Sequence, residues 1–335
     1  MKHQPQAEKR QPLPAYPFSK HYIIHGMGLN IESNAPHIIE LLHQALYPFE
    51  GAGANAPCPR IQFRLRENPE IDAACIQGLE PVSFCMEMTY YSRDSRLFTH
   101  IPARFLAQAD LDRLTVLCDI SPSYTHNQWF IFHQVFFPIL AETLKHLHIF
   151  NIHTAALANG EQGILFPAQA RSGKSTLSIK LLEAGFNFLS DDICFLTRDS
   201  NGLRLLGFPE PIQIWEETRR FFPNLNLKLH PEGDCPNLKK SLRADELFPE
   251  AIRTWARPRF LVIPQIIAGE SSHLDPLAKT EALQKLIPQS LMVANRNIVG
   301  QHLKILTDLV SACDCYRLQM GSDIEQVPAL IRQLF

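Results

Sequence analysis

The chain has 335 residues, of which 45% are hydrophobic and 20% charged, as in a globular protein with a substantial apolar core and room for two domains. Its formal net charge of -2 at pH 7 gives no electrostatic reason to expect a nucleic acid or an anionic membrane as partner. The eight cysteines are scattered, without a Cys-x-x-Cys pair, so we interpret them as buried free thiols rather than metal ligands.

The first 17 residues, MKHQPQAEKRQPLPAYP, are polar and rich in proline. They contain no apolar stretch of the kind found in the centre of a signal peptide, so we expect a disordered arm over residues 1–17. The most apolar segment, WFIFHQVFFPILAETL, contains His, Gln, Pro and Glu and is not typical of a membrane span. We therefore expect a cytoplasmic protein without a membrane partner.

Residues 18–148 are expected to form an α+β N-terminal domain without a chemical motif. The segment SKHYIIHGMGLNIES predicts two strands, and HIIELLHQALYPF predicts a short helix. In PRIQFRLRE the apolar and polar residues alternate, as in a strand with one buried face. A helix is predicted over 128–148, because large apolar residues recur there at helical spacing, and Pro138 either kinks it or marks its start.

Residues 149–335 are expected to form a second, α/β domain. A hairpin is predicted around ANGEQ, followed by the loop PAQARSGKS, the helix TLSIKLLEAG and the strand FNFLSDDICFLT. Further strands are predicted in LRLLGFPEPIQIW and RFLVIPQII, and helices in KTEALQKLIPQSL, VGQHLKILTDLVSAC and DIEQVPALIRQLF. A strand, a loop and a helix in this order are typical of a nucleotide-binding core.

The loop matches the phosphate-binding pattern G-x-x-x-x-G-K-[ST], except that Ala168 stands where the pattern has its first glycine. In such a loop the backbone N–H groups cradle phosphates, the lysine reaches the β- and γ-phosphates, and the serine hydroxyl holds Mg²⁺. An ordinary negative φ is expected at Ala168, because alanine disfavours the left-handed conformation. We predict that Ser175 holds Mg²⁺ and that ATP is bound by Ala168, Gln169, Ala170, Arg171, Ser172, Gly173, Lys174, Ser175 and Thr176.

Two adjacent aspartates, Asp191 and Asp192, follow the helix at the end of a strand. Neighbouring carboxylates are costly if they are buried without partners. Beside Mg²⁺ and a phosphate, one can serve the metal and the other can take a proton from an acceptor hydroxyl. A pair of turn or helix-capping aspartates is the alternative interpretation. His153, which precedes the loop, is a third candidate residue.

The segment IHTAALANGEQGILFPAQARSGKSTLSIKLLEAGFNFLSDD resembles the catalytic domain of HPr kinase/phosphorylase, and more closely the HPr-kinase-related proteins that accompany peptide biosynthesis clusters. The spacings from His153 to Lys174 and from Lys174 to Asp191 both fit that family. The resemblance implies a core related to phosphoenolpyruvate carboxykinase and transfer of phosphate from ATP to a serine hydroxyl of a peptide or protein. It also implies that Asp191 is the proton acceptor, that Ser175 and Asp192 serve the metal, and that His153 lies beside the transferred phosphate.

This sequence departs from the family at Ala168, and at Thr176, where the bifunctional enzymes have a glutamate. The Arg- and Gly-rich signature that those enzymes use for dephosphorylation is missing after Asp192. We therefore expect neither HPr as the acceptor nor a phosphorylase activity. A serine of a precursor peptide, as in lasso-peptide clusters, is the analogous substrate.

Two other functions remain open, namely a kinase for a small hydroxylated metabolite and a nucleotide-binding regulatory module without catalysis. Lys239, Lys240 and Arg243 are candidates for a phosphate or acidic-substrate clamp, with a solvated face as the alternative. The acceptor and the oligomeric state are not determined by the sequence, and a homo-oligomer stays open.

Overall fold

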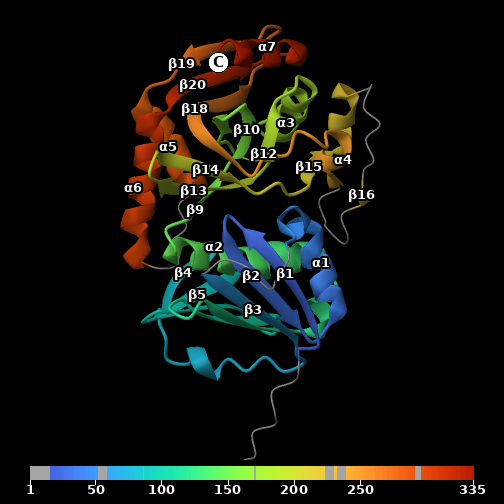
Figure 1. Cartoon of the computed structure of the whole chain (residues 1–335), viewed down its shortest axis with the longest axis vertical. Coiled ribbons are helices and arrows are strands. Elements are labelled where there is room, and N and C mark those ends of the chain that lie inside the picture. Colours follow the sequence, from blue (N-terminus) through green and yellow to red (C-terminus); the bar gives the residue numbers. More distant parts are fainter. Residues whose placement is uncertain are drawn as a thin grey trace, which may run out of the picture.

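The computed structural model describes residues 16–51, 59–85, 87–169, 171–222, 230–231, 239–290 and 296–335. The predicted disordered arm therefore lies, except for its last two residues, outside the described part of the chain. The protein is mixed α/β with two large sheets, as the sequence predicts. The sheet from the first half lies in the lower part of Figure 1, and the sheet from the second half lies above it.

The first sheet has eight strands in the order β1-β2-β3-β8-β7-β6-β5-β4. Its pairs β2–β3 and β3–β8 are parallel. The predicted alternation in the third strand is confirmed, because Ile61, Phe63 and Leu65 are buried on one face. Its elements are β1 (Phe18–Ile24), β2 (Met27–Ser33), α1 (Pro36–Leu46), β3 (Arg60–Glu67), β4 (Pro81–Cys85), β5 (Met88–Arg93), β6 (Arg96–Ile101), β7 (Phe105–Asp110) and β8 (Thr115–Ile120).

The helix predicted over 128–148 consists of two parts of different geometry. A π-helical segment, η5 (Phe130–Phe136), leads directly into α2 (Phe137–His146). Pro138 lies in the first turn of α2, directly after the π-helical segment, and has no N–H to donate to the preceding turn. Leu140 and Leu144 face the core. The prediction of one continuous helix is thus corrected to a π-helix followed by an α-helix.

The second sheet contains nine strands, with the main order β12-β10-β11-β18-β14-β13-β9. Strand β20 continues it beside β18, and β19 pairs with β20. The predicted hairpin is confirmed, since Asn159 pairs with Gln162 at its turn. The strands are β9 (Phe150–His153), β10 (Ala155–Asn159), β11 (Gln162–Phe166), β12 (Asn187–Ser190), β13 (Ile193–Asp199), β14 (Gly202–Gly207), β18 (Trp255–Ile266), β19 (His273–Pro276) and β20 (Asp314–Met320).

Helices cover both faces of this sheet. Successive residues of β10 enter different apolar clusters, since Ala156 packs with α5 and α6 while Leu157 packs with α3 and α7. A small sheet of β15 (Ile212–Trp215), β16 (His230–Pro231) and β17 (Lys239–Leu242) lies beside α3. The helices are α3 (Lys174–Glu183), α4 (Ala244–Leu247), α5 (Lys279–Ser290), α6 (Arg296–Ala312) and α7 (Val327–Arg332).

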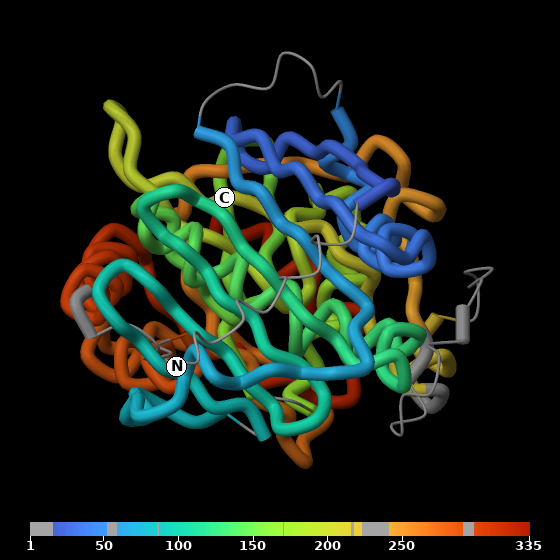
Figure 2. The backbone as a smooth tube through the Cα atoms, turned by 90° about the horizontal axis from the view of Figure 1, so that it is seen from below, coloured from blue at the N-terminus to red at the C-terminus, as the bar shows by residue number. Residues whose placement is uncertain are grey.

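The two halves share one apolar cluster. Phe195 and Phe208 of the second half pack in the core of the first, where the ring of Phe208 lies 5.2 Å from that of Phe49. Seen from below in Figure 2, the blue and cyan strands of the first sheet lie nearest the viewer, with the second half behind them. None of the helices in the described ranges is long and apolar enough to cross a membrane.

Candidate active site

The predicted phosphate loop connects β11 to α3. Helix α3 begins at Lys174, directly after Gly173, and no side chain caps its first turn. The N–H groups of this turn therefore point to the space before the helix, where the helix dipole favours an anion. Ala170 lies outside the described residues, and the other residues of the predicted loop lie between the strand and the helix or in its first turn.

Two residues give the loop its shape. Arg171 and Gly173 have positive φ angles of 67° and 87°, whereas Ala168 is not among the residues with positive φ. The prediction of an ordinary backbone at Ala168 is thus confirmed. A Cβ atom on Gly173 would lie 2.9 Å from Cε of Met320, the end of a flexible side chain, so it is chiefly the backbone conformation that favours glycine there.

Lys174 is folded across its own loop. Its Nζ donates hydrogen bonds to the carbonyl oxygens of Ala168, at 2.5 Å, and of Gln169, at 3.2 Å. The side chain is buried, with 8% of its surface exposed. The ammonium group is therefore held at the centre of the loop, where a bound phosphate would meet it.

The two aspartates directly follow the end of a strand, as predicted, and lie in a break before the next strand begins. Strand β12 ends at Ser190 and pairs with β10, and β13 begins at Ile193 and pairs with β9 and β14. The single strand predicted for FNFLSDDICFLT is corrected accordingly. Because the chain changes partners here, the adjacent side chains of Asp191 and Asp192 contact different groups.

Asp191 is buried against α3. Its Oδ2 accepts a hydrogen bond of 2.6 Å from Oγ of Ser175, and its Oδ1 accepts one of 2.8 Å from Oγ of Ser178. Burial raises the pKa of Asp191, although the two hydroxyl groups oppose this effect. The result is a loop serine and a buried carboxylate in direct contact, which is an oxygen pair of the kind that Mg²⁺ prefers.

Asp192 is more exposed and contacts a histidine. Its Oδ1 lies 3.0 Å from Nε2 of His153, and the two side chains keep 46% and 40% of their surface exposed. Burial by itself raises the pKa of Asp192, but the hydrogen bond from His153 and the nearby positive charges hold it below the usual range. The register of β9 against β13 sets this contact, because it pairs His153 with Ile193, the neighbour of Asp192.

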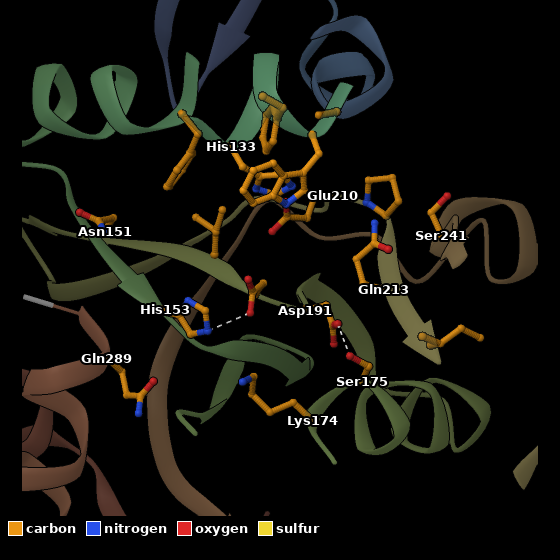
Figure 3. Close-up of a pocket in the computed structure, with 18 of the residues that line it drawn as sticks. His133, Asn151, His153, Lys174, Ser175, Asp191, Glu210, Gln213, Ser241 and Gln289 are labelled. Carbon is orange, nitrogen blue, oxygen red and sulfur yellow. Dashed lines mark hydrogen bonds and ion pairs between the residues drawn. The ribbon is translucent and has the colours of Figure 1, made fainter. Parts of the chain in front are cut away.

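A cavity of about 1040 Å³ opens above these residues. Figure 3 shows His153, Lys174, Ser175 and Asp191 at its base, with His133 above them. The walls come from both halves of the chain, since η5 and β5 of the first half line the cavity together with the loop and β15 of the second. The structure thus brings the predicted catalytic and phosphate-binding residues to one place.

Sequence reasoning missed the contribution of the first half. His133 lines the cavity at helical spacing from Trp129 and Phe137, and its charge acts on Asp192. No motif marks these residues, because their position depends on how the two halves pack. Ser178 could have been found, since it is a small polar residue three positions after Ser175 on an apolar helix face.

The candidate clamp is not assembled as one group. Arg243 lines the cavity, but it forms an ion pair with Asp245 at 2.7 Å and lies over the ring of Tyr47 at 3.9 Å. Lys239 and Lys240 belong to β17, and their side chains lie outside the described part of the structure. Arg243 is therefore occupied by neighbours in this arrangement.

Among the residues that the structure describes, the loop has no preformed metal cluster beside it. Within the described ranges, no group of three or more His, Cys, Asp and Glu side chains could hold a metal ion. A Mg²⁺ ion bound together with a nucleotide does not need such a group, because the phosphates supply several of its ligands. Cys118, Cys194, Cys313 and Cys315 are buried free thiols, as predicted, whereas Cys75 is exposed.

A scan against protein-family models and a search of the curated proteins gave no match to this chain. Among solved structures, the chain is similar to the HPr(Ser) kinase/phosphatase from Coxiella burnetii, with 12% sequence identity over 55% of this chain and 94% of that chain. The TM-score is 0.29. A likeness at this level carries no conclusion about activity, which therefore has to be inferred from the geometry of the site.

Proposed function

We propose that the protein is an ATP-dependent kinase that transfers phosphate to a serine hydroxyl of a peptide or protein. One observation carries the proposal: two adjacent carboxylates flank the phosphate loop, and each has a different partner. Asp191 contacts the loop serine, Ser175, and Asp192 contacts His153 at the cavity. One metal-binding carboxylate and one carboxylate open to an acceptor are the parts that phosphoryl transfer requires.

The phosphates of ATP would be held by the loop and by the first turn of α3, with Lys174 turning from the loop carbonyls toward the β- and γ-phosphates. Ser175 and Asp191 fit a Mg²⁺ ion, because they offer a hydroxyl and a buried carboxylate oxygen side by side. Mg²⁺ would neutralise the charge that develops on the transferred group. A core related to phosphoenolpyruvate carboxykinase is part of this proposal.

Relative to the roles implied by the family resemblance, the geometry favours an exchange between the aspartates. Asp191 is enclosed by the hydroxyls of Ser175 and Ser178, which leaves little room for an acceptor. Asp192 is open to the cavity, and His153 fixes its orientation. We therefore assign the metal to Asp191 and the proton transfer to Asp192, whose lowered pKa keeps it ionised. A carboxylate with a low pKa is a weak base. It is sufficient here because phosphoryl transfer passes through a loose transition state, in which the acceptor hydroxyl needs little activation.

Calorimetry with Mg²⁺-ATP tests the proposal at its first step. Lys174→Ala should weaken ATP binding by about 10- to 100-fold, because a hydrogen bond to a charged group contributes about 1.5–3 kcal/mol. Lys285→Ala, an exposed lysine of α5, is the matched control and should bind as the unmodified protein does. Equal affinity in the two variants would contradict the assignment of the phosphate loop.

A further inference from the structure

The cavity extends to both sides of the loop. In Figure 3, Gln213 and Ser241 lie on the side of Ser175, while Asn151 and Gln289 lie on the side of His153. In a phosphate loop the lysine reaches the terminal phosphates, and the α-phosphate with its nucleoside lies farther from the transferred group. The acceptor hydroxyl approaches the transferred phosphate, so it belongs on the side of Asp192 and His153. We call this side the acceptor arm, and it is lined by Asn151, His153, Asp192, Gln289 and Ser290.

Four uncharged side chains of the cavity wall carry a buried oxygen without a hydrogen-bond partner within the described structure: Oγ of Ser172 in the loop, and Oε1 of Gln134, Oδ1 of Asn151 and Oγ of Ser290 outside it. Gln134 and Ser290 are deeply buried, with 8% and 3% of their surface exposed. Asn151 and Ser290 come from β9 and α5, which pack against each other. Buried polar atoms are nearly always paired, so unpaired oxygens on side chains that line a cavity indicate a ligand that donates hydrogen bonds to them once these side chains turn toward it.

Apolar side chains also line the cavity. Met88, Trp129, Phe132 and Phe137 all belong to the first half of the chain. Phe132 is buried, whereas Trp129 and Phe137 are partly exposed. A ligand in this cavity therefore meets uncharged hydrogen-bonding groups as well as aromatic side chains. It needs both donor groups and apolar surface.

On the basis of the kinase function proposed above, we propose that the acceptor arm binds an uncharged peptide segment in which apolar residues flank the phosphorylated serine. Main-chain N–H groups of the segment donate to Asn151 and Ser290, and its apolar side chains pack on Trp129 and Phe137. A small polyhydroxylated molecule fits less well, because hydroxyl groups turned toward the aromatic wall would lose their hydrogen bonds to water without replacement. A charged residue beside the serine would lose even more favourable hydration at the aromatic wall.

A panel of ten-residue peptides, each with one central serine, tests the inference. The residues beside the serine are Leu, Asn, Glu or Lys, and the initial rate of phosphate transfer from labelled ATP is measured for each peptide. We expect the Leu-flanked peptide to have a kcat/KM about tenfold or more above those of the Glu- and Lys-flanked peptides, the range in which apolar pockets discriminate. Equal rates for all flanking residues would overturn the proposal, as would faster phosphorylation of glycerol or glucose than of any peptide.

Variants of the wall provide the second readout. Trp129→Ala should raise KM for the Leu-flanked peptide and reduce the preference for it, while ATP affinity stays unchanged and Trp129→Phe restores most of the preference. Phe84→Ala removes an aromatic residue of the same half of the chain, one that is 72% exposed, and should change neither value. If the two alanine variants behave alike, the aromatic wall does not select the acceptor. Failure of the kinase function itself would look different, because ATP binding would then not depend on Lys174.

Discussion

The side chains of two adjacent aspartates reach different partners because the strand that carries them breaks after Ser190. Asp191 is turned toward the hydroxyls of α3, and Asp192 is turned toward His153. At this scale, burial and hydrogen-bond partners determine which carboxylate suits a metal ion and which suits a proton. The assignment can be tested by replacing each one separately.

Asp192→Asn should lower the rate of phosphate transfer by about 10²-fold, the lower part of the usual range for loss of a general base, without changing the Mg²⁺ requirement. Asp191→Asn should instead raise the Mg²⁺ concentration needed for half-maximal rate. Phosphate transfer with Mg²⁺ titrated in both variants provides the measurement. The opposite pattern would return the base to Asp191, as the family resemblance implies.

Asp191 should also affect stability. Its pKa is raised in the folded protein, so its contribution favours folding as the pH falls through that pKa, and its buried charge disfavours folding above it. Asp191→Asn should therefore increase the melting temperature at pH 7 in the absence of nucleotide. The increase should shrink in acid, where Asp191 itself becomes protonated. A melting temperature lower than that of the unmodified protein at neutral pH would show that the hydroxyl contacts outweigh the charge.

Gly173 gives a prediction from backbone conformation. Gly173→Ala places a Cβ on a residue with a φ of 87°, at a cost of about 1–2 kcal/mol. Because Cε of Met320 is the end of a flexible side chain, it can move away, so the cost of Gly173→Ala should be nearly the same in the unmodified protein and in a Met320→Ala background. Met320 is itself buried, so chemical denaturation has to compare the double variant with Met320→Ala alone. A cost that disappears in the Met320→Ala background would mean that the contact, rather than the backbone, requires glycine.

At the scale of elements, the sequence predicted most of the site because its signals are local. The loop follows a fixed pattern, the hairpin has an Asn-Gly turn, and the alternation in β3 follows directly from its apolar residues. The break at Asp191 was not predictable in this way, since it depends on which strands β12 and β13 pair with. The π-helical geometry of η5 was not predictable either, because the spacing of its apolar residues also fits an ordinary α-helix.

Helix α2 contains a buried ion pair that allows a test at this scale. Glu142 and Lys145 each have 2% of their side-chain surface exposed and form a contact of 2.5 Å. Lys145→Met should destabilise the protein by about 3–5 kcal/mol, because it leaves a buried charge without its counter-ion. Glu142→Leu combined with Lys145→Met should recover most of that loss. Denaturant titrations of both variants decide the matter, and a double variant as unstable as the single one would contradict the explanation.

At the scale of the whole molecule, the proposed boundary near residue 148 separates two sheets but not two independent cores. Ile193, Phe195, Leu206 and Phe208 of the second half pack in the apolar cluster of the first. The cavity likewise has walls from both halves. No sequence pattern indicated this, since contacts between distant segments leave no local signature. The division into two domains near residue 148 therefore stays a proposal, and the two halves are not proposed to fold independently.

This shared cluster predicts cooperative unfolding. Differential scanning calorimetry of the full chain should show one transition, and Mg²⁺-ATP should shift it upward as a whole. A fragment containing residues 149–335 should fail to fold, because it exposes Phe195 and Phe208, which are fully buried in the intact chain. Two separate transitions, of which only one responds to nucleotide, would contradict a common core.

The folded-back position of Lys174 has a consequence for the timing of binding. Its ammonium group donates to the carbonyl oxygens of Ala168 and Gln169, so the loop itself competes with a phosphate for the same positive charge. An incoming phosphate must take the place of these internal partners, and capture then includes a rearrangement step after the first encounter. Stopped-flow traces with a fluorescent ATP analogue should therefore level off to a limiting rate as the ligand concentration increases.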